Sequence, residues 1–205
     1  MSTLKEIHKG LKRCSEGDPV ATYLRGIGVT KVPDNVYFHP GLKLIDVADY
    51  KEVDRGLFPA MVIPYRDSSG VLVAYEIRYL PDKLRYVGVL QGGSAHFGEP
   101  ETKLIVAVNS NDAMLFHERT DNPVWCAGVP SNMENICIPA NVKEVGVLAG
   151  TGLKNRQAAY GFASKWMLIG KVVKVILQTS VDEKIIDVYD DGKVVDLVEF
   201  YSKNW

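Results

Sequence analysis

Leu104-Ile105-Val106-Ala107-Val108 is one uninterrupted apolar run of this sequence, and Val145-Gly146-Val147-Leu148-Ala149 is another. Short runs without polar alternation are typical of strands that are buried on both faces of a parallel sheet. The segments around them predict helices and strands in turn, over residues 111–117, 123–127, 150–166 and 172–177. Because strands alternate with helices, residues 104–180 are predicted to form a parallel α/β unit.

The preceding residues, 1–103, are predicted to form an α+β region with a β-hairpin. Together with the parallel unit that follows, this gives a predicted fold class of α/β for the whole chain. Apolar residues at helical spacing predict a helix over 4–14, and Gly17-Asp18-Pro19 separates it from a second helix that ends near Leu24. Residues 59–66 and 71–80 are predicted to pair as a β-hairpin around the turn Asp67-Ser68-Ser69-Gly70. The segments left over predict loops at 34–40 and 91–103, with a short strand allowed over 42–47.

The acidic C-terminal region, residues 181–205, has two interpretations that the sequence leaves open. Ile185–Val188 and Val194–Val198 flank Asp191-Gly192, which predicts a hairpin. The acidic region also ends in aromatic residues, Phe200-Tyr201-Ser202-Lys203-Asn204-Trp205, and in this it resembles the tails by which single-strand-binding proteins recruit partners.

The composition is that of an ordinary globular domain. The chain has 205 residues, 46% apolar and 24% charged, which is too apolar and too balanced in charge for a disordered chain. Its net charge of −1 argues against non-specific coating of duplex DNA but allows a local basic groove. No apolar run reaches the roughly 20 residues that cross a bilayer, so no membrane partner is expected. Cys14, Cys126 and Cys137 lie far apart and form no metal-ligand cluster, so we expect reduced, buried thiols in a cytoplasmic protein. The four histidines show no spacing typical of a metal site or a nucleophile–base pair.

Several short motifs follow one another between residues 21 and 177. They are Tyr23-Leu24-Arg25-Gly26-Ile27-Gly28, Phe38-His39-Pro40, Pro59-Ala60-Met61-Val62, Ile77-Arg78-Tyr79-Leu80, Gly92-Gly93, Leu104-Ile105-Val106-Ala107, Pro123-Val124-Trp125-Cys126-Ala127 and Val145-Gly146-Val147-Leu148-Ala149. In this order and spacing they resemble the primase-like Toprim proteins of phages and mobile elements. The resemblance implies a Toprim-like α/β unit and nucleic acid as the ligand. Toprim proteins make RNA primers or cut and rejoin DNA, using Mg²⁺ held by carboxylates.

This sequence differs from the Toprim family at the positions of the family's catalytic carboxylates. The family's catalytic Glu follows the first apolar strand, where this chain has Val108, and its Asp-x-Asp follows the later strand, where this chain has Gly150-Thr151-Gly152. All three carboxylates of the family are therefore missing at these positions. Because Mg²⁺ is held by oxygen ligands, usually carboxylates, we expect no metal, no cofactor and no catalysis. Asp112 is the nearest acid, and its position favours a helix N-terminal role. An active primase or nuclease would need other acids, such as Asp112 with Glu118 or Glu134.

Two basic segments are candidate nucleic-acid contacts. Lys154 and Arg156 follow the glycines at the start of a predicted helix, where backbone N–H groups and the helix dipole favour a phosphate. The competing interpretation is that the glycines only form a tight turn. In the hairpin region, aromatic and basic residues are interleaved in the mixture that binds single strands, at Tyr65, Arg66, Arg78, Tyr79, Lys83, Arg85 and Tyr86. The candidate contacts among them are Arg66, Arg78, Lys83, Arg85 and Tyr86. Here the alternative is an ordinary sheet, with Tyr75 and Tyr79 in its core.

The favoured hypothesis is a non-catalytic nucleic-acid-binding protein that prefers single-stranded DNA. Its size and altered site also resemble the single-stranded-DNA-binding RNA polymerase cofactors of lytic phages. That resemblance implies a phage protein in the host cytoplasm, an accessory factor in transcription or replication whose partners are RNA polymerase or replication proteins. The alternative is a protein-interaction module or decoy for such a protein. The residues do not distinguish a monomer from a homo-oligomer.

Overall fold

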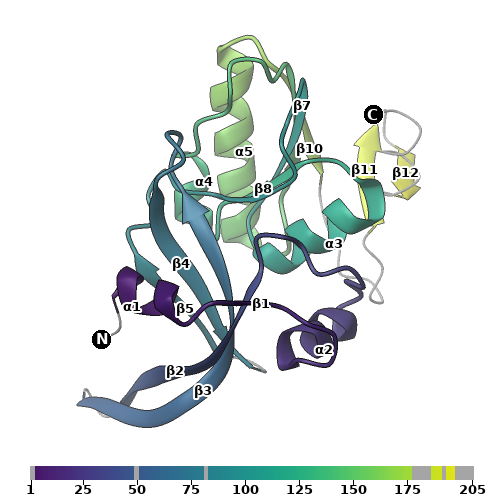
Figure 1. The fold of residues 1–205 in the computed structure, drawn as a ribbon. Coiled ribbons are helices and arrows are strands. Elements are labelled where there is room, and N and C mark those ends of the chain that lie inside the picture. Colours follow the sequence, from purple (N-terminus) through teal and green to yellow (C-terminus); the bar gives the residue numbers. More distant parts are fainter. Residues whose placement is uncertain (1–2, 49–50, 81–82, 177–185, 191–192, 197–205) are drawn as a thin grey trace. The chain divides into compact units, whose positions relative to one another are not determined.

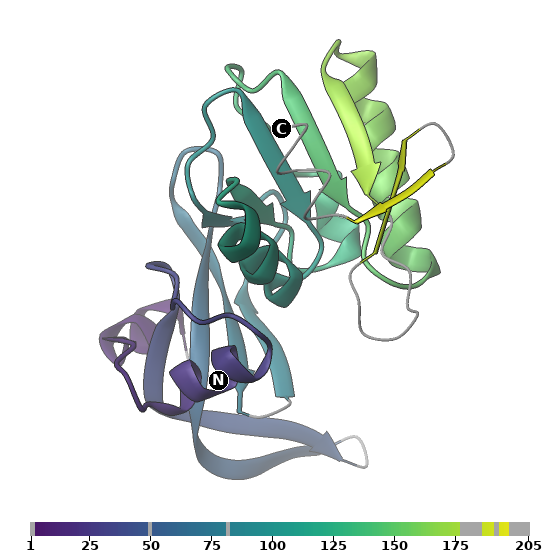
Figure 2. The ribbon, with the colours of Figure 1, turned by 90° about the vertical axis from the view of Figure 1, so that its right-hand side faces the viewer.

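The computed structural model describes residues 3–48, 51–80, 83–176, 186–190 and 193–196. The chain divides into two compact units, Met1–Leu90 and Gln91–Trp205. Each unit has its own five-stranded sheet, and the second also holds a separate two-stranded pair (Figures 1 and 2).

The first unit is an antiparallel sheet in the order β1-β2-β3-β4-β5. Its elements are α1 (Leu4–Lys9), β1 (Lys12–Arg13), α2 (Pro19–Gly26), β2 (Tyr37–Ala48), β3 (Lys51–Arg66), β4 (Leu72–Tyr79) and β5 (Lys83–Gly88). The predicted hairpin is confirmed as β3 and β4, and its turn is closed by the Gly70 N–H, which donates to the Asp67 carbonyl over 2.9 Å. β2 and β3 continue as a long two-stranded ribbon (Figure 1).

Two predictions for the first unit are wrong at their boundaries. α1 starts with a capping box between Thr3 and Glu6 but ends at Gly10, so the helix does not reach residue 14. Lys12 instead pairs with Phe38, because β1 adds to the edge of β2. The same pairing makes residues 37–40 part of a strand, although Pro40 and the neighbouring turn residues had predicted a loop.

The two faces of β4 have different environments, as its alternation predicts. Tyr75, Ile77 and Tyr79 are buried in an apolar cluster with Ile7 of α1, which confirms the core role of both tyrosines. The other face carries Glu76 and the residues around it.

The second unit contains the predicted parallel α/β arrangement. Its sheet has the order β10-β9-β7-β8-β6, in which β10, β9, β7 and β8 are parallel and β6 is antiparallel to β8. The elements are β6 (Ala95–Phe97), β7 (Lys103–Ala107), α3 (Ser110–Thr120), β8 (Val124–Cys126), α4 (Pro130–Met133), β9 (Glu144–Leu148), α5 (Leu153–Leu168) and β10 (Val172–Ile176). α3 and α5 cover opposite faces of this sheet (Figures 1 and 2). β6 lies in a segment predicted to be a loop, and α4 was not predicted.

At the end of the described chain, β11 (Ile186–Asp190) and β12 (Lys193–Asp196) pair antiparallel. This pair agrees with the hairpin interpretation of the acidic region, and residues 197–205 lie outside the described residues. None of the helices described is both long enough and apolar enough to cross a bilayer.

The cysteines are free, but they are not all buried. Cys126 is buried and donates to the Val108 carbonyl over 3.4 Å, Cys14 is half-buried, and Cys137 is exposed. The expectation of three buried thiols is therefore wrong for Cys137, which follows Ile136, a core residue. Burial, reinforced by the nearby Asp18, raises the pKa of the Cys14 thiol to about 12.

We expect Cys137 to be alkylated first when the folded protein is treated with iodoacetamide at pH 8. Cys126 is shielded, and Cys14 has almost no reactive thiolate because its pKa lies far above that pH. Mass spectrometry of peptides at successive times measures the three rates, and a reaction in urea is the control in which all three thiols are accessible. Equal rates for Cys14 and Cys137 in the folded protein would contradict this expectation.

Candidate nucleic-acid interface

The carboxyl ends of β7 and β9 lie side by side, because these strands are parallel neighbours with Ala107 opposite Leu148. Val108 follows β7 directly, and its side chain is 4% exposed and packed in the apolar core. Gly150 and Gly152 follow β9, with φ of +64° and +93°. This edge of the sheet therefore presents a buried apolar side chain and two glycines. Within the part of the chain that the structure describes, no group of His, Cys, Asp and Glu side chains could hold a metal ion.

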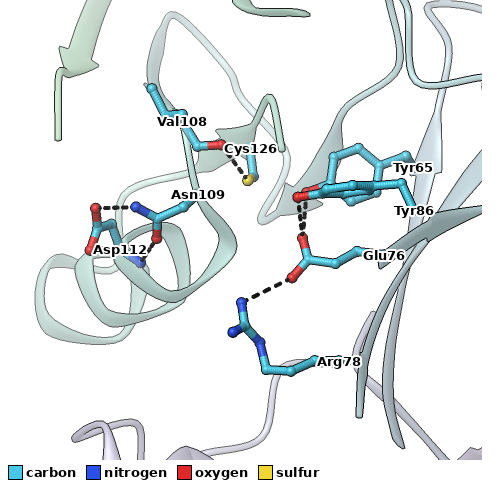
Figure 3. A network of polar contacts seen from close by, with 8 residues as sticks. All are labelled: Tyr65, Glu76, Arg78, Tyr86, Val108, Asn109, Asp112 and Cys126. Atoms are coloured by element: carbon cyan, nitrogen blue, oxygen red, sulfur yellow. Dashed lines mark hydrogen bonds and ion pairs between the residues drawn. The ribbon is translucent and has the colours of Figure 1, made fainter. Parts of the chain in front are cut away.

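Asp112 belongs to the N-terminus of α3, as the sequence predicts. Asn109 is the N-cap and accepts the Asp112 N–H over 2.9 Å, while its amide donates to the Asp112 carboxylate over 2.6 Å (Figure 3). A carboxylate in the first turn of a helix is stabilised by the helix dipole.

The N-terminus of α5 has no side-chain cap. Gly152 is its N-cap residue and has no side chain to accept from the first-turn N–H groups. Lys154 in this turn is exposed, and Arg156 is partly buried with no hydrogen-bond partner at Nε. The Asn155 amide donates to the Thr151 carbonyl over 2.7 Å, which holds the glycine turn against the helix. The structure thus combines a tight turn with uncapped N–H groups and two cations.

The hairpin cations do not share one surface. Arg78 and Tyr86 lie on the face of Glu76, since Tyr86 is opposite Glu76 and Arg78 is next but one along β4. Lys83 and Arg85 lie on the other face, opposite Tyr79 and Ile77. Arg66 is exposed at the far end of β3, where its guanidinium donates to the Gly70 carbonyl over 3.0 Å.

Glu76 holds the side chains of Arg78 and Tyr86 in polar contacts within the first unit. Its side chain is 1% exposed, and one carboxylate oxygen accepts from the Tyr65 hydroxyl at 2.8 Å and from the Tyr86 hydroxyl at 3.3 Å (Figure 3). Arg78 lies 3.5 Å from the other oxygen and also packs over the Tyr23 ring of α2. This network, which sequence reasoning missed, engages Arg78 and Tyr86 within the unit. An acidic residue in a strand of apolar and aromatic residues was the available signal.

Lys83 lies beside a surface groove on the opposite face. The groove has a volume of about 340 Å³ and is lined by Leu44, Asp46, Arg55, Phe58, Tyr79, Leu80 and Lys83. Burial raises the pKa of the Tyr79 hydroxyl, although the nearby Arg85 opposes that effect. Arg55, Asp46 and Phe58 were not among the candidate residues from sequence, because they come from the distant ribbon of β2 and β3.

The structure also brings one histidine next to a serine, which the spacing did not predict. Ser94 Oγ lies 2.9 Å from His96 Nε2, and the His96 ring stacks on Trp125 with centroids 3.9 Å apart. Ser94 is 3% exposed, so a substrate has no access to its hydroxyl. The pair is accordingly part of the packing of β6 against β8.

The chain is similar in fold to DNA primases. A DNA primase domain from Pseudomonas aeruginosa shares 16% sequence identity with a TM-score of 0.53, and the match covers 85% of this chain and 68% of that one. The DnaG primase catalytic domain bound to ssDNA shares 15% identity with a TM-score of 0.52, covering 82% and 69%. The zinc-binding and RNA polymerase domains of the Aquifex aeolicus primase share 15% identity with a TM-score of 0.53, covering 92% and 53%.

These likenesses confirm the primase-like, Toprim-like α/β fold that the motifs imply. The chain spans between 53% and 69% of the length of those structures. The family model of a domain of unknown function (DUF7146) matches residues 3–100. Among curated proteins, none matches the sequence.

Proposed function

We propose that the chain is a non-catalytic protein of phage origin that binds single-stranded DNA and assists transcription or replication. The observation that carries this proposal is a primase-like fold in which β7 is followed by Val108, and β9 by Gly150 and Gly152, instead of by carboxylates. Because Mg²⁺ is held in such sites by carboxylate oxygens, this edge lacks the ligands for it. A similar structure, the DnaG catalytic domain, is bound to ssDNA.

The two cationic segments supply the contacts in this proposal. A phosphate fits the uncapped N-terminus of α5, because the N–H groups and Lys154 and Arg156 all favour an anion. On the first unit, Lys83 and Arg85 contact the sugar-phosphate backbone of the bound DNA strand. Arg78 and Tyr86 instead interact with Glu76 within the protein. RNA polymerase or a replication protein is the partner that such a factor brings to the DNA.

Fluorescence anisotropy of a labelled single-stranded oligonucleotide and its duplex, in EDTA and at several salt concentrations, tests the function. We expect binding that prefers the single strand, does not need a metal and weakens as salt rises, because phosphate-bound cations release counterions from the DNA. The variant Lys154→Ala with Arg156→Ala should bind more weakly, and the salt slope should fall by about one for each cation that binds a phosphate in the wild type. Arg119→Ala with Lys143→Ala removes the same charge from other exposed positions of the second unit and is the matched control.

The outcomes separate this proposal from its competitors. An Mg²⁺-dependent product that Asp112→Ala abolishes would show an active primase or nuclease, and the non-catalytic proposal would be wrong. Absence of binding to either oligonucleotide would favour a protein-interaction module. One observation favours that second function: large apolar side chains are exposed around the end of α5, at Met167, Leu168, Ile169 and Val172.

A further inference from the structure

The groove on the first unit combines cations with an apolar floor. Arg55 and Lys83 stand at its rim, with side chains 49% and 52% exposed. Leu44 and Tyr79 are buried in the floor, and the half-buried Phe58 also lines it. The volume of about 340 Å³ falls within the range of sites that take one small ligand or one unit of a polymer.

Both cations at the rim share one carboxylate. Arg55 Nε lies 3.7 Å from Asp46 Oδ2, and the Lys83 ammonium contacts the same oxygen. The two cations and the single acid leave an excess of one positive charge. The two cations are about half exposed and Asp46 is 33% exposed, so each ion pair is worth at most about 1 kcal/mol and is readily exchanged for another anion.

We propose that this groove binds one nucleotide unit of single-stranded DNA and that Asp46 competes with its phosphate. The phosphate takes the place of the carboxylate between Arg55 and Lys83, and the base packs against Phe58. Cations beside an aromatic ring are the combination by which proteins hold single strands without sequence preference. This inference rests on the proposed function and adds to it a site and an internal competitor.

Asp46→Asn is expected to increase affinity for a single-stranded oligonucleotide by about three- to tenfold at low salt, because a negative charge leaves the rim while the shape of the side chain stays. Asp54→Asn is the matched control. Asp54 forms a similar exposed pair with Lys43 at 2.8 Å on the same ribbon, but it does not line the groove. The increase should therefore be seen at Asp46 and be much smaller at Asp54.

Variants that remove the cations or the ring complete the test by anisotropy. Arg55→Ala with Lys83→Ala should weaken binding and flatten its salt dependence, whereas Phe58→Leu should weaken it about fivefold or more with the salt slope unchanged. If the wild type does not bind single-stranded DNA, the proposed function itself fails. If it binds, but these variants and Asp46→Asn match the wild type, the groove is overturned and the function stands. Equal gains at Asp46 and Asp54 would also overturn it, because they would reflect net charge alone.

Discussion

Glu76→Ala is expected to lower the free energy of unfolding by about 3–5 kcal/mol, because it removes one partner of a buried charged network. The Arg78 guanidinium loses its carboxylate while its side chain is only 14% exposed. The Tyr65 hydroxyl, in a fully buried residue, loses the oxygen to which it donates over 2.8 Å. Urea unfolding followed by far-UV circular dichroism measures the change. Tryptophan fluorescence is unsuitable, because the first unit, residues 1–90, contains no tryptophan.

A double-mutant cycle controls for the simple loss of side-chain volume. If the ion pair matters, Glu76→Ala with Arg78→Ala together should cost less than the sum of the single changes, by about 0.5–3 kcal/mol. Additive losses, or a loss below about 1 kcal/mol for Glu76→Ala, would show that the network contributes little. The same cycle decides how Arg78 variants are to be interpreted in binding experiments, since a weaker interaction with DNA could follow from a loosened sheet.

The sequence predicts the second unit better than the first, for a physical reason. Each apolar run such as 104–108 is long enough to be recognised by itself, and βα alternation follows from neighbouring segments. β1 and the first half of β2 depend instead on each other: Lys12 pairs with Phe38, and neither segment alternates strongly. Likewise β5 carries three charged or polar-tipped candidates in six residues, so only its pairing with β4 identifies it as a strand.

For the candidate site too, the sequence predicts what a local motif fixes and does not predict what depends on strand pairing. The sequence correctly places Val108 and Gly150 after their strands, because each position is fixed by a local motif. It does not separate Arg78 from Lys83, since sharing a face depends on where β5 pairs with β4. The groove residue Arg55 is still harder to find, because a ribbon remote in sequence brings it to Lys83 through Asp46.

Gly88→Ala is expected to cost about 3 kcal/mol or more of unfolding free energy, because Gly88 combines a left-handed backbone with a close approach to β4. Its φ is +110°, and a Cβ there would lie 2.2 Å from the Val73 carbonyl oxygen and 2.8 Å from the Ala74 Cα. Both are backbone atoms, so no side-chain rotation relieves the clash. That carbonyl also accepts the Val89 N–H over 3.0 Å, and the substitution would separate β5 from β4 where this bond forms.

Gly70→Ala separates the two contributions. Gly70 has φ of +80° but no neighbouring atom within 4 Å of the added Cβ, so its variant carries only the backbone strain. That strain amounts to about 1–2 kcal/mol. Urea unfolding of both variants by far-UV circular dichroism gives the difference, which we expect to be about 1–2 kcal/mol or more in favour of Gly70→Ala. Equal losses of unfolding free energy in the two variants would mean that β5 moves away from β4 at Gly88 without a further loss of stability. A larger loss at Gly88 means that the strand bearing Lys83 and Arg85 is held to β4 at this point, and therefore that those cations occupy fixed positions on the sheet.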